Sequence, residues 1–258
     1  MKEYKTFYET CRAIVAVVVA LLIRLRVAGL QHLPKEGPVI LISNHLNWTD
    51  VPTVAFRYKR RVHYMAKAEL FQKAPLKWLV IGLGAFPVRR GEADRQAIKQ
   101  AEEVLKAGQV LVIFPEGTRS KTRVMKEGLP GAALIALRSG APVVPVGIYG
   151  SEKFKLWHIW PFRTQITITY GEPFTLSREG KRAHTDLQMQ LDVMMRHIAE
   201  LLPPQYQGKY ALSGEVASPA QIQTGGTVAP AAQLQPGDEQ EATEDVAAET
   251  QATGGSAE

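Results

Sequence analysis

Short apolar runs alternate with helical patterns through most of this chain, and this alternation restricts the fold more than any other feature of the sequence. Runs typical of buried strands occupy residues 38–43, 61–66, 110–114, 142–149 and 165–170. Helical patterns occupy residues 51–58, 92–107, 130–138 and about 185–203, the last with Thr185 as its N-cap. Strands that alternate with helices predict an α/β domain with a layered, largely parallel sheet flanked by helices.

The net charge of +6 hides a division of the chain into a basic part and an acidic part. Residues 213–258 contain eight acidic residues and no Lys or Arg, whereas residues 1–212 carry all 31 basic residues against 17 acidic ones, a charge of +14. The acidic segment has no aromatic residue and cannot bury enough apolar surface to offset its conformational entropy. We therefore predict that residues 213–258 form a disordered tail.

The basic part suggests a polyanionic partner, either nucleic acid or an anionic membrane, and its basic residues cluster at 57–61. The sequence shows no zinc-finger spacing and no aromatic signature of RNA recognition. The single cysteine, Cys11, excludes an internal disulfide and a cysteine-based zinc site, and we expect it to be a small buried side chain. A reduced, cytoplasm-facing domain follows from this cysteine usage.

An unbroken apolar run, residues 13–23, lies near the N-terminus. As a helix it would reach ~16 Å, whereas a bilayer core of ~30 Å needs about 20 apolar residues, so it does not span a membrane comfortably. A signal peptide is disfavoured, because arginines rather than a cleavage site follow the run. A buried core helix remains possible, as does a helix in the membrane interface with Arg12, Arg24 and Arg26 reaching lipid phosphates. The flanking cations favour the second, so we predict an interfacial helix within residues 1–30.

His45 and Asp50 follow the strand-like run 38–43 with a spacing that suits acid–base chemistry. Asp50 can fold back onto Nδ1 of the imidazole, fix its tautomer and increase the basicity of Nε2. Their position supports this interpretation, because ligands of α/β sheets collect outside the carboxyl ends of the strands. The spacing alone also fits a helix-capping Asp beside a surface His. The sequence contains neither a G-x-S-x-G nucleophile motif nor a P-loop.

A second polar segment, residues 114–120 (FPEGTRS), begins where another apolar run ends. Arg119 offers a fork of donors that suits a phosphate, and Gly117 lets the backbone approach a ligand closely. Glu116 follows a proline beside an apolar strand, so it must find a partner or lie in the site. An ordinary Pro-Glu-Gly turn is the alternative.

Lys67 and Arg89 lie between these two segments and follow further strand-like stretches. Solvated surface charge is the usual role of such residues and stays open for both. Convergent polar residues at several strand ends nevertheless point to a shared anion site at that edge of the sheet.

Four short blocks follow one another along the chain: Asn44-His45-x4-Asp50; Lys67-x-Glu69-Leu70 with Phe86-Pro87-Val88-Arg89; residues 114–120; and Val143-Val144-Pro145-Val146. Together they resemble the four motif blocks of the 1-acylglycerol-3-phosphate (lysophosphatidic acid) acyltransferases, within the glycerolipid acyltransferase superfamily. The resemblance runs from about Arg26 to Gly171 and more loosely to Tyr210. Asn47-Trp48 is a departure, because many members carry a small hydroxyl residue in this block.

The resemblance implies a role for each of these residues. His45 would remove the proton from a glycerol hydroxyl as it attacks an acyl thioester, and Asp50 would orient the imidazole. Arg119, with Lys67, would hold the acceptor phosphate. The substrate-binding residues predicted in this way are Lys67, Arg89, Glu116, Gly117, Thr118 and Arg119.

The resemblance also implies the reactants and the location. The catalytic domain would be residues 31–212, and it would convert lysophosphatidate to phosphatidate on the cytoplasmic face of the cell membrane, as a peripheral or monotopic protein. Acyl-CoA or acyl carrier protein would supply the acyl group as co-substrate, with no metal, no resident cofactor and no nucleic acid partner. The alternatives are another acceptor, such as glycerol 3-phosphate or a different lysophospholipid, and a non-catalytic phospholipid-binding protein. His45 and Asp50 count against the last, since a pure binder needs no base.

Overall fold

The computed structural model of the chain describes residues 2–72, 74, 76–89, 94–155, 163–176 and 183–211. The chain divides into two units, Met1–Ser213 and Gly214–Glu258, and the elements named below belong to the first. The tail predicted at residues 213–258 lies outside the described residues, so its disorder stays a prediction.

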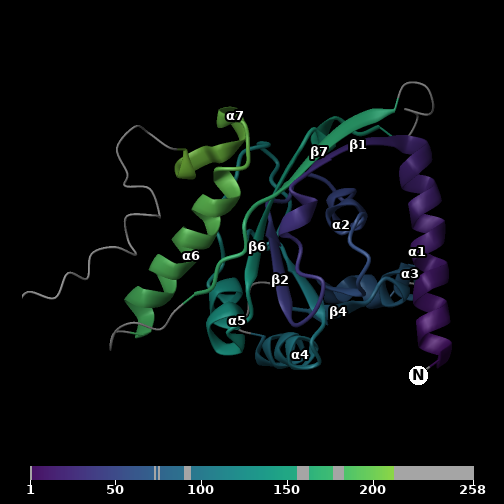
Figure 1. Ribbon diagram of the computed structural model, residues 1–258, viewed down its shortest axis with the longest axis horizontal. Coiled ribbons are helices and arrows are strands. Elements are labelled where there is room, and N and C mark those ends of the chain that lie inside the picture. Colours follow the sequence, from purple (N-terminus) through teal and green to yellow (C-terminus); the bar gives the residue numbers. More distant parts are fainter. Residues whose placement is uncertain are drawn as a thin grey trace, which may run out of the picture. The chain divides into compact units, whose positions relative to one another are not determined.

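Within the described residues, seven strands form one sheet (Figure 1). They are β1 (Ile23–Ala28), β2 (Val39–Ser43), β3 (Val62–Lys67), β4 (Ala85–Val88), β5 (Val110–Ile113), β6 (Val143–Tyr149) and β7 (Thr164–Tyr170). Their order across the sheet is β1-β7-β6-β2-β5-β3-β4, and neighbouring strands are parallel except for β6 and β7. The predicted α/β class with a largely parallel sheet is confirmed.

Helices cover both faces of this sheet (Figure 1). They are α1 (Lys2–Leu22), α2 (Asp50–Val54), α3 (Leu76–Gly82), α4 (Arg95–Lys106), α5 (Gly131–Ser139), α6 (Ala183–Ala199) and α7 (Pro204–Gln207). Ile40 and Ile42 of β2 pack with α4, α5 and α6, whereas Val39 and Leu41 pack with α1 and α2 on the other face. The central strands read as continuous apolar runs because both of their faces are buried.

Three helix boundaries differ from the predictions. α4 begins at Arg95 rather than at residue 92, because the Asp94 carboxylate accepts hydrogen bonds from the amides of the second and third helical residues, both at 3.1 Å. α6 begins at Ala183, so Thr185 lies inside the helix and is not its N-cap. α2 ends at Val54 and is shorter than the predicted helix.

The N-terminal apolar run is helical as predicted, but the helix ends at Leu22. Ile23 already belongs to β1, where it pairs with Thr164 of β7. Arg24 and Arg26 therefore lie on a strand of the sheet, and the prediction that they flank an interfacial helix is wrong.

Arg12 also has a different environment from the one predicted. Its guanidinium donates hydrogen bonds to the main-chain oxygens of Tyr58 (2.9 Å) and Lys59 (3.4 Å). It therefore ties α1 to the segment after α2 instead of reaching lipid phosphates.

The two faces of α1 show features of both interpretations of the apolar run. Tyr8, Cys11 and Val19 are buried against the domain, and Cys11 is the small buried side chain that we predicted. The opposite face exposes Phe7, Ile14, Val17, Val18 and Leu21. Among the helices of the described segments, none combines the length and the hydrophobicity needed to cross a bilayer.

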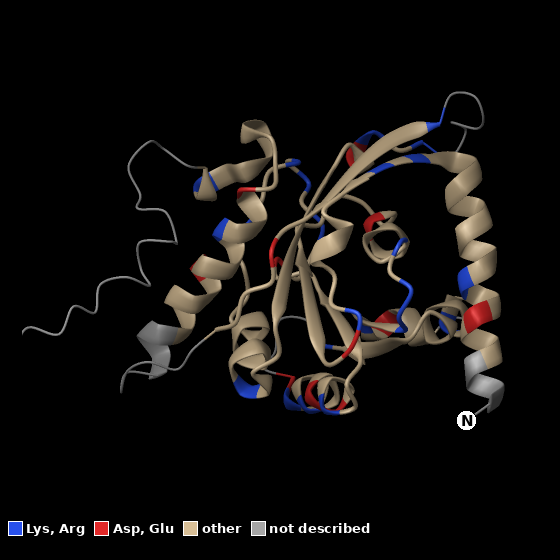
Figure 2. Ribbon diagram, in the orientation of Figure 1, with Lys and Arg blue, Asp and Glu red and all other residues tan. Residues whose placement is uncertain are grey.

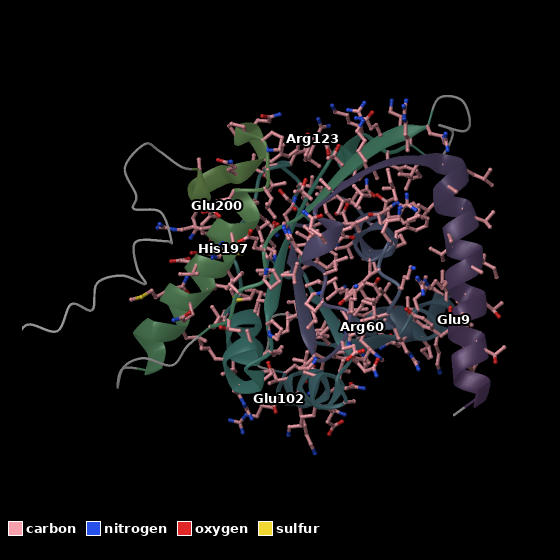
Figure 3. All side chains as sticks on the ribbon, in the orientation of Figure 1. Glu9, Arg60, Glu102, Arg123, His197 and Glu200 are labelled. Atoms are coloured by element: carbon pink, nitrogen blue, oxygen red, sulfur yellow. The ribbon has the colours of Figure 1, made fainter. Side chains whose placement is uncertain are left out.

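Part of the basic cluster at residues 57–61 holds the domain together. The Arg60 guanidinium donates to the carbonyl oxygens of Gly37 and Gly108, which come shortly before β2 and β5 (Figure 3). Arg61 lies over the Tyr8 ring of α1, 5.1 Å from its centroid. These two cations therefore have partners within the protein and contribute less to an external polyanion site than the sequence suggested.

Candidate active site

Three of the predicted motif blocks meet at one edge of the sheet, where the parallel strands β2, β3, β4 and β5 end (Figure 1). The fourth block, Val143–Val146, forms the first part of β6 and pairs with β2. Ile42 of β2 pairs with Ile113 of β5, so the register, continued past the strand ends, brings His45 opposite Glu116. The two polar segments singled out in the sequence are thus neighbours in space.

His45 and Asp50 form a buried pair. His45 Nδ1 lies 2.9 Å from Asp50 Oδ2, and the side chains are 9% and 0% exposed. The same carboxylate oxygen accepts hydrogen bonds from the amides of Leu46 (2.6 Å) and Asn47 (2.7 Å). Because Asp50 acts as an acceptor for these amides, Nδ1 is the ring nitrogen that faces a carboxylate, and Nε2 is the one left for a substrate. A capping Asp beside a surface His does not describe this arrangement.

The main chain of His45 is also fixed on both sides. Its amide donates to Glu116 Oε1 (3.1 Å), and its carbonyl oxygen accepts from the amide of Ser120 (2.7 Å). The second oxygen of Glu116 accepts from the amide of Lys126 (3.2 Å). Both oxygens of this 4% exposed residue therefore bind main-chain amides.

Burial raises the pKa of Glu116 to about 7. The amide hydrogen bonds from His45 and Lys126 and the charge of Lys126 lower the pKa, while the Asp50 carboxylate raises it. Burial is the largest of these effects, so Glu116 titrates near neutrality.

Two further residues, Asn44 and Phe114, position His45, although no role was predicted for them from the sequence. The Asn44 side chain donates to the carbonyl oxygen of Ile148 and accepts from its amide, both at 2.8 Å, which joins the end of β2 to β6. Phe114 stacks on the imidazole with ring centroids 4.2 Å apart. An Asn after a strand is also an ordinary turn residue, so its place in the motif was the available signal.

Lys67 and Arg89 come from adjacent strand ends, since Lys67 of β3 pairs with Val88 of β4. Lys67 Nζ lies 3.0 Å from the Glu69 carboxylate, and Arg89 Nε lies 3.7 Å from the Asp94 carboxylate. Both cations remain exposed, with side chains 49% (Lys67) and 64% (Arg89) accessible. A phosphate would therefore have to share them with carboxylates.

Gly117, Thr118 and Arg119 form the turn after β5. Gly117 has a φ of +67°, and a Cβ there would lie 2.5 Å from Leu129 Cδ1, so the turn requires glycine. The Thr118 hydroxyl accepts a hydrogen bond from Lys126 Nζ. Arg119 is exposed and has no hydrogen bond or ion pair within the described segments. Lys67 and Arg89 each contact a carboxylate, whereas Arg119 is open to a ligand or to solvent.

The structure joins His45, Asp50 and Glu116 directly but does not join the cations to them. Across the described ranges, no hydrogen bond or ion pair links Lys67, Arg89 or Arg119 to His45. Nor do three His, Cys, Asp or Glu side chains come close enough there to hold a metal ion.

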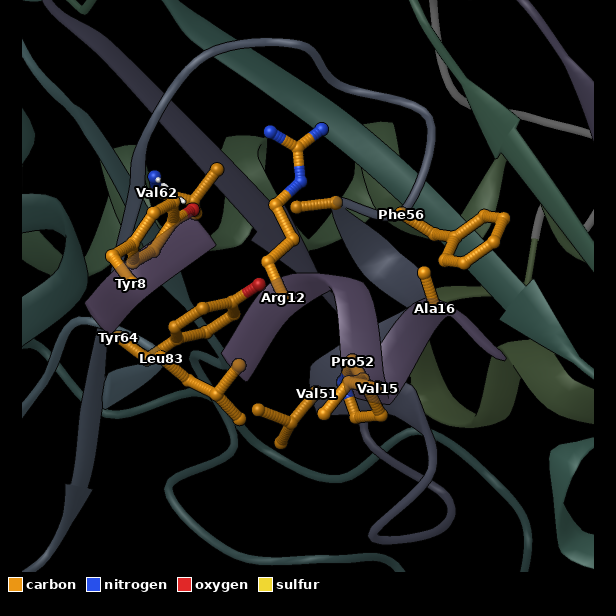
Figure 4. Close-up of a pocket in the computed structure, with 11 residues that line it drawn as sticks. Tyr8, Arg12, Val15, Ala16, Val51, Pro52, Phe56, Val62, Tyr64 and Leu83 are labelled. Atoms are coloured by element: carbon orange, nitrogen blue, oxygen red, sulfur yellow. Dashed lines mark hydrogen bonds between the residues drawn. The ribbon is translucent and has the colours of Figure 1, made fainter. Parts of the chain in front are cut away.

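A small cavity lies beside α2, between this helix, α1 and β3 (Figure 4). Its lining is mainly apolar and includes Val15, Val51, Pro52 and Tyr64, with Arg12 at one side. Its volume of about 50 Å³ is well below the ~300 Å³ at which ligand pockets begin, so it does not hold an acyl chain in this conformation.

Comparison with known proteins assigns the chain to a family. The family model described as Acyltransferase matches residues 24–149, which include all four predicted motif blocks. The 1-acyl-sn-glycerol-3-phosphate acyltransferase of Bacillus subtilis is 32% identical over 149 residues, covering 57% of this chain and 74% of the relative. The chain belongs to the 1-acyl-sn-glycerol-3-phosphate acyltransferase family.

Two other matches agree with this assignment, one in sequence and one in fold. The enzyme of the same name from Pseudomonas aeruginosa is 29% identical over 189 residues, covering 71% of this chain and 72% of the relative. The crystal structure of the 1-acyl-sn-glycerophosphate acyltransferase PlsC from Thermotoga maritima has a TM-score of 0.58 with 24% identity, over 78% of this chain and 82% of that one. The structural likeness supports the fold. The family resemblance stated from the motifs is confirmed, and the chain is an acyltransferase.

Proposed function

We propose that this acyltransferase moves an acyl group from a thioester to the free hydroxyl of 1-acylglycerol 3-phosphate and so produces phosphatidate, with His45 as general base. The observation that carries the proposal is the 2.9 Å contact between His45 Nδ1 and the buried Asp50. It leaves Nε2 as the basic nitrogen at the carboxyl edge of the sheet.

The reaction needs one proton relay. Nε2 of His45 takes the proton of the acceptor hydroxyl as the oxygen attacks the thioester carbonyl. The carbon–sulfur bond of the resulting tetrahedral intermediate then breaks, and the imidazolium returns the proton to the leaving thiolate. Asp50 stabilises the imidazolium while it carries the proton, so the cycle regenerates neutral His45 and needs no resident cofactor.

Two serines near the site support direct transfer rather than an acyl-enzyme. The hydroxyl of Ser43 donates to the carbonyl oxygen of Asn44 (3.1 Å), and that of Ser120 donates to the carbonyl oxygen of Val124 (2.6 Å). Neither hydroxyl is hydrogen-bonded to the imidazole of His45, as that of an activated nucleophile would be. Direct transfer requires both substrates to be bound at His45 at the same time.

We assign the acceptor phosphate to Arg119, with Lys67 and Arg89 adding positive charge from the neighbouring strand ends. Arg119 can form a bidentate pair with a phosphate. Gly117 and Thr118 shape the turn that presents it, and Glu116 anchors that turn to His45.

Arg119→Ala is expected to raise the KM for the phosphorylated acceptor about 30-fold, with a smaller effect on kcat, because a charged hydrogen bond contributes about 2 kcal/mol. Steady-state kinetics at saturating thioester measure it. Lys121→Ala is the control, since it removes an exposed cation from the same loop. An unchanged KM for Arg119→Ala would remove this residue from the phosphate site.

The acceptor is tested by thioester-dependent acylation with purified protein on lysophosphatidate, glycerol 3-phosphate and lysophosphatidylcholine. We expect the highest kcat/KM on lysophosphatidate. Turnover on lysophosphatidylcholine alone would overturn the proposed acceptor, and no turnover on any acceptor would overturn the proposed function.

We further propose that the enzyme works as a peripheral protein on the cytoplasmic face of the membrane, where its lysolipid substrate partitions. The exposed apolar face of α1 supports this location, and α3 beside it exposes Leu76, Trp78 and Leu79. Apolar side chains exposed on adjacent helices can enter the interface between headgroups and acyl chains.

The double variant Val17→Gln/Leu21→Gln is expected to weaken binding to lipid vesicles at least tenfold, because these side chains are 59% and 53% exposed and lose their apolar contact with lipid. Vesicle sedimentation measures it. Met189→Gln on α6, also 58% exposed, is the control. Equal sedimentation of both variants and the wild type would show that α1 does not bind the membrane.

A further inference from the structure

A second cavity, of about 370 Å³, opens beside the carboxyl end of β6 and the beginning of β7. It is lined by Tyr149, Gly150, Lys153, Arg163, Thr164, Gln165, Thr167 and Tyr206. None of these residues belongs to the motif blocks, and the reaction described above uses none of them. Its volume lies within the ~300–1,000 Å³ range of small-molecule sites.

Two tyrosines form an aromatic wall of this cavity, which we call the β6–β7 cavity. The rings of Tyr149 and Tyr206 have centroids 5.8 Å apart. The hydroxyl of Tyr206 donates to Glu152 Oε1 (2.7 Å), and its carbonyl oxygen accepts from the amide of Met125 (2.8 Å), so the ring is held in place. Burial raises the pKa of Tyr206 to about 12, and the phenol therefore adds no negative charge.

Cations surround the polar side of the β6–β7 cavity. Lys153 is exposed at its rim, and Arg163 lines it while donating one hydrogen bond to the carbonyl oxygen of Ala20 (2.7 Å). Both of these side chains are positively charged at neutral pH.

Strand β1 adds two more cations, Arg24 and Arg26. Arg24 pairs in register with Gln165 of β7, and Arg26 pairs with Thr167. Side chains paired across neighbouring strands point to the same face of a sheet, and neighbouring strands lie about 4.8 Å apart. The two exposed arginines therefore stand on the same face of the sheet as Gln165 and Thr167, which line the cavity. The ribbon of β1 carries the blue of basic residues in Figure 2. The apolar residues of β1 pack on the opposite face.

The cavity lies on the opposite side of His45 from the predicted phosphate site. In the sheet, β2 stands between β5, β3 and β4, which carry Arg119, Lys67 and Arg89, and β6 and β7, which carry the cavity. The Asn44 side chain binds the main chain of Ile148, the residue before Tyr149. Asn44 and Ile148 therefore connect His45 to the lining of the cavity. Direct transfer needs a place for each substrate, and the sheet offers one on each side of the base.

We propose that the β6–β7 cavity binds the phosphorylated nucleotide portion of a coenzyme A thioester, with the adenine ring against Tyr149 and Tyr206 and the phosphates beside Lys153, Arg24 and Arg26. This inference rests on the proposed direct transfer from a thioester. An acidic carrier protein would also be attracted to these cations. The aromatic wall favours a nucleotide, because a base can stack on the tyrosine rings, whereas a protein partner needs a larger contact surface.

Calorimetric titration of the full chain with free coenzyme A tests the site without turnover. We expect Arg24→Gln/Lys153→Gln to weaken binding about tenfold, since two charged contacts to phosphate are lost. Lys99→Gln/Lys106→Gln is the matched control, because it removes two exposed cations from α4. Equal affinity of both variants, or no binding by the wild type, would overturn the proposal.

Kinetics separate this inference from the proposed function. The wild type is assayed with acyl-CoA, with an acyl-pantetheine thioester that lacks the nucleotide, and with an acylated carrier protein. We expect Arg24→Gln/Lys153→Gln to lower the ratio of kcat/KM for acyl-CoA to that for acyl-pantetheine about tenfold. A wild type that uses the carrier protein but not acyl-CoA would overturn the nucleotide site while supporting acyl transfer, whereas no turnover with any thioester would overturn the proposed function itself.

Binding to anionic vesicles is the last measurement, because the same cations could bind lipid phosphates instead of nucleotide phosphates. We expect the double variant to lose more affinity for coenzyme A than for vesicles. Loss of vesicle binding with unchanged coenzyme A binding would show that these cations face the membrane, and it would overturn the nucleotide site.

Discussion

His45→Ala is expected to lower kcat about 10³-fold while leaving the fold intact, because general-base catalysis of this kind contributes about 10²- to 10⁴-fold. The change removes the nitrogen that accepts the hydroxyl proton. It leaves the loop in place, since Asp50 still accepts two amide hydrogen bonds and Glu116 still binds the main chain of residue 45. Steady-state rates at saturating substrates, with circular dichroism of the same samples, measure both effects.

Asp50→Asn tests how His45 is held. The amide group can present its NH₂ to Nδ1, which would force the other tautomer and place a proton on Nε2. We therefore expect a loss of kcat of the same order as for His45→Ala. His197→Gln on α6 is the control, because this histidine stacks on Phe174, which pairs with Val143 at the beginning of β6 and not with the loop that carries His45. If His45→Ala kept more than a tenth of the wild-type rate, another group would be the base.

The sequence allowed the central strands and the catalytic pair to be predicted for the same physical reason. β2 and β5 are buried on both faces, so they are apolar throughout, and the first polar residues mark the points where they leave the core. His45 and Glu116 follow those points closely. Parallel strands bring their carboxyl ends to one edge, which made neighbours of two segments about 70 residues apart in sequence.

The strand β1 could not be predicted, because no polar residue separates it from α1. Leu22 ends the helix and Ile23 begins the strand, and both pack against the same apolar cluster. The alternation that follows, with Arg24 and Arg26 exposed, is typical of an edge strand. The same two arginines also suit the end of a helix at a membrane. Pairing with β7 decides between a strand and a helix here, and β7 lies about 140 residues away in the sequence.

The sequence predicted only part of the role of Glu116. Its position between a proline and a glycine beside an apolar strand required a partner or a place in the site. The partners are main-chain amides, one 71 residues before it and one 10 residues after it. No side-chain pattern predicts a contact with a backbone group at that distance, so the sequence favoured a substrate-binding role.

Glu116→Ala is expected to lower kcat about 100-fold and the free energy of unfolding by about 2 kcal/mol, because a buried and a partly buried amide lose their acceptor and the loop carrying His45 loses its anchor. The KM for lysophosphatidate is expected to change little if Glu116 acts through His45. A rise in that KM at constant kcat would instead make Glu116 a substrate contact. Glu102→Ala is the matched control, since this buried carboxylate pairs with Arg138 on the far side of the core, and it should lower stability without lowering kcat.

The pH dependence of unfolding gives an independent test of Glu116. The pKa of Glu116 is about 7 in the folded protein, against 4.5 for a free glutamate side chain. Between these values the folded state binds more proton than the unfolded state, so the stability from this group is fully present below about pH 4.5 and is lost as the pH rises through 7, by up to about 3 kcal/mol. Glu116→Gln does not titrate, and the stability of the wild type relative to this variant should therefore fall between pH 5 and pH 8. Denaturant unfolding at these two pH values measures the difference. A constant relative stability over the same range would show that the carboxylate is ionised throughout and would overturn the raised pKa.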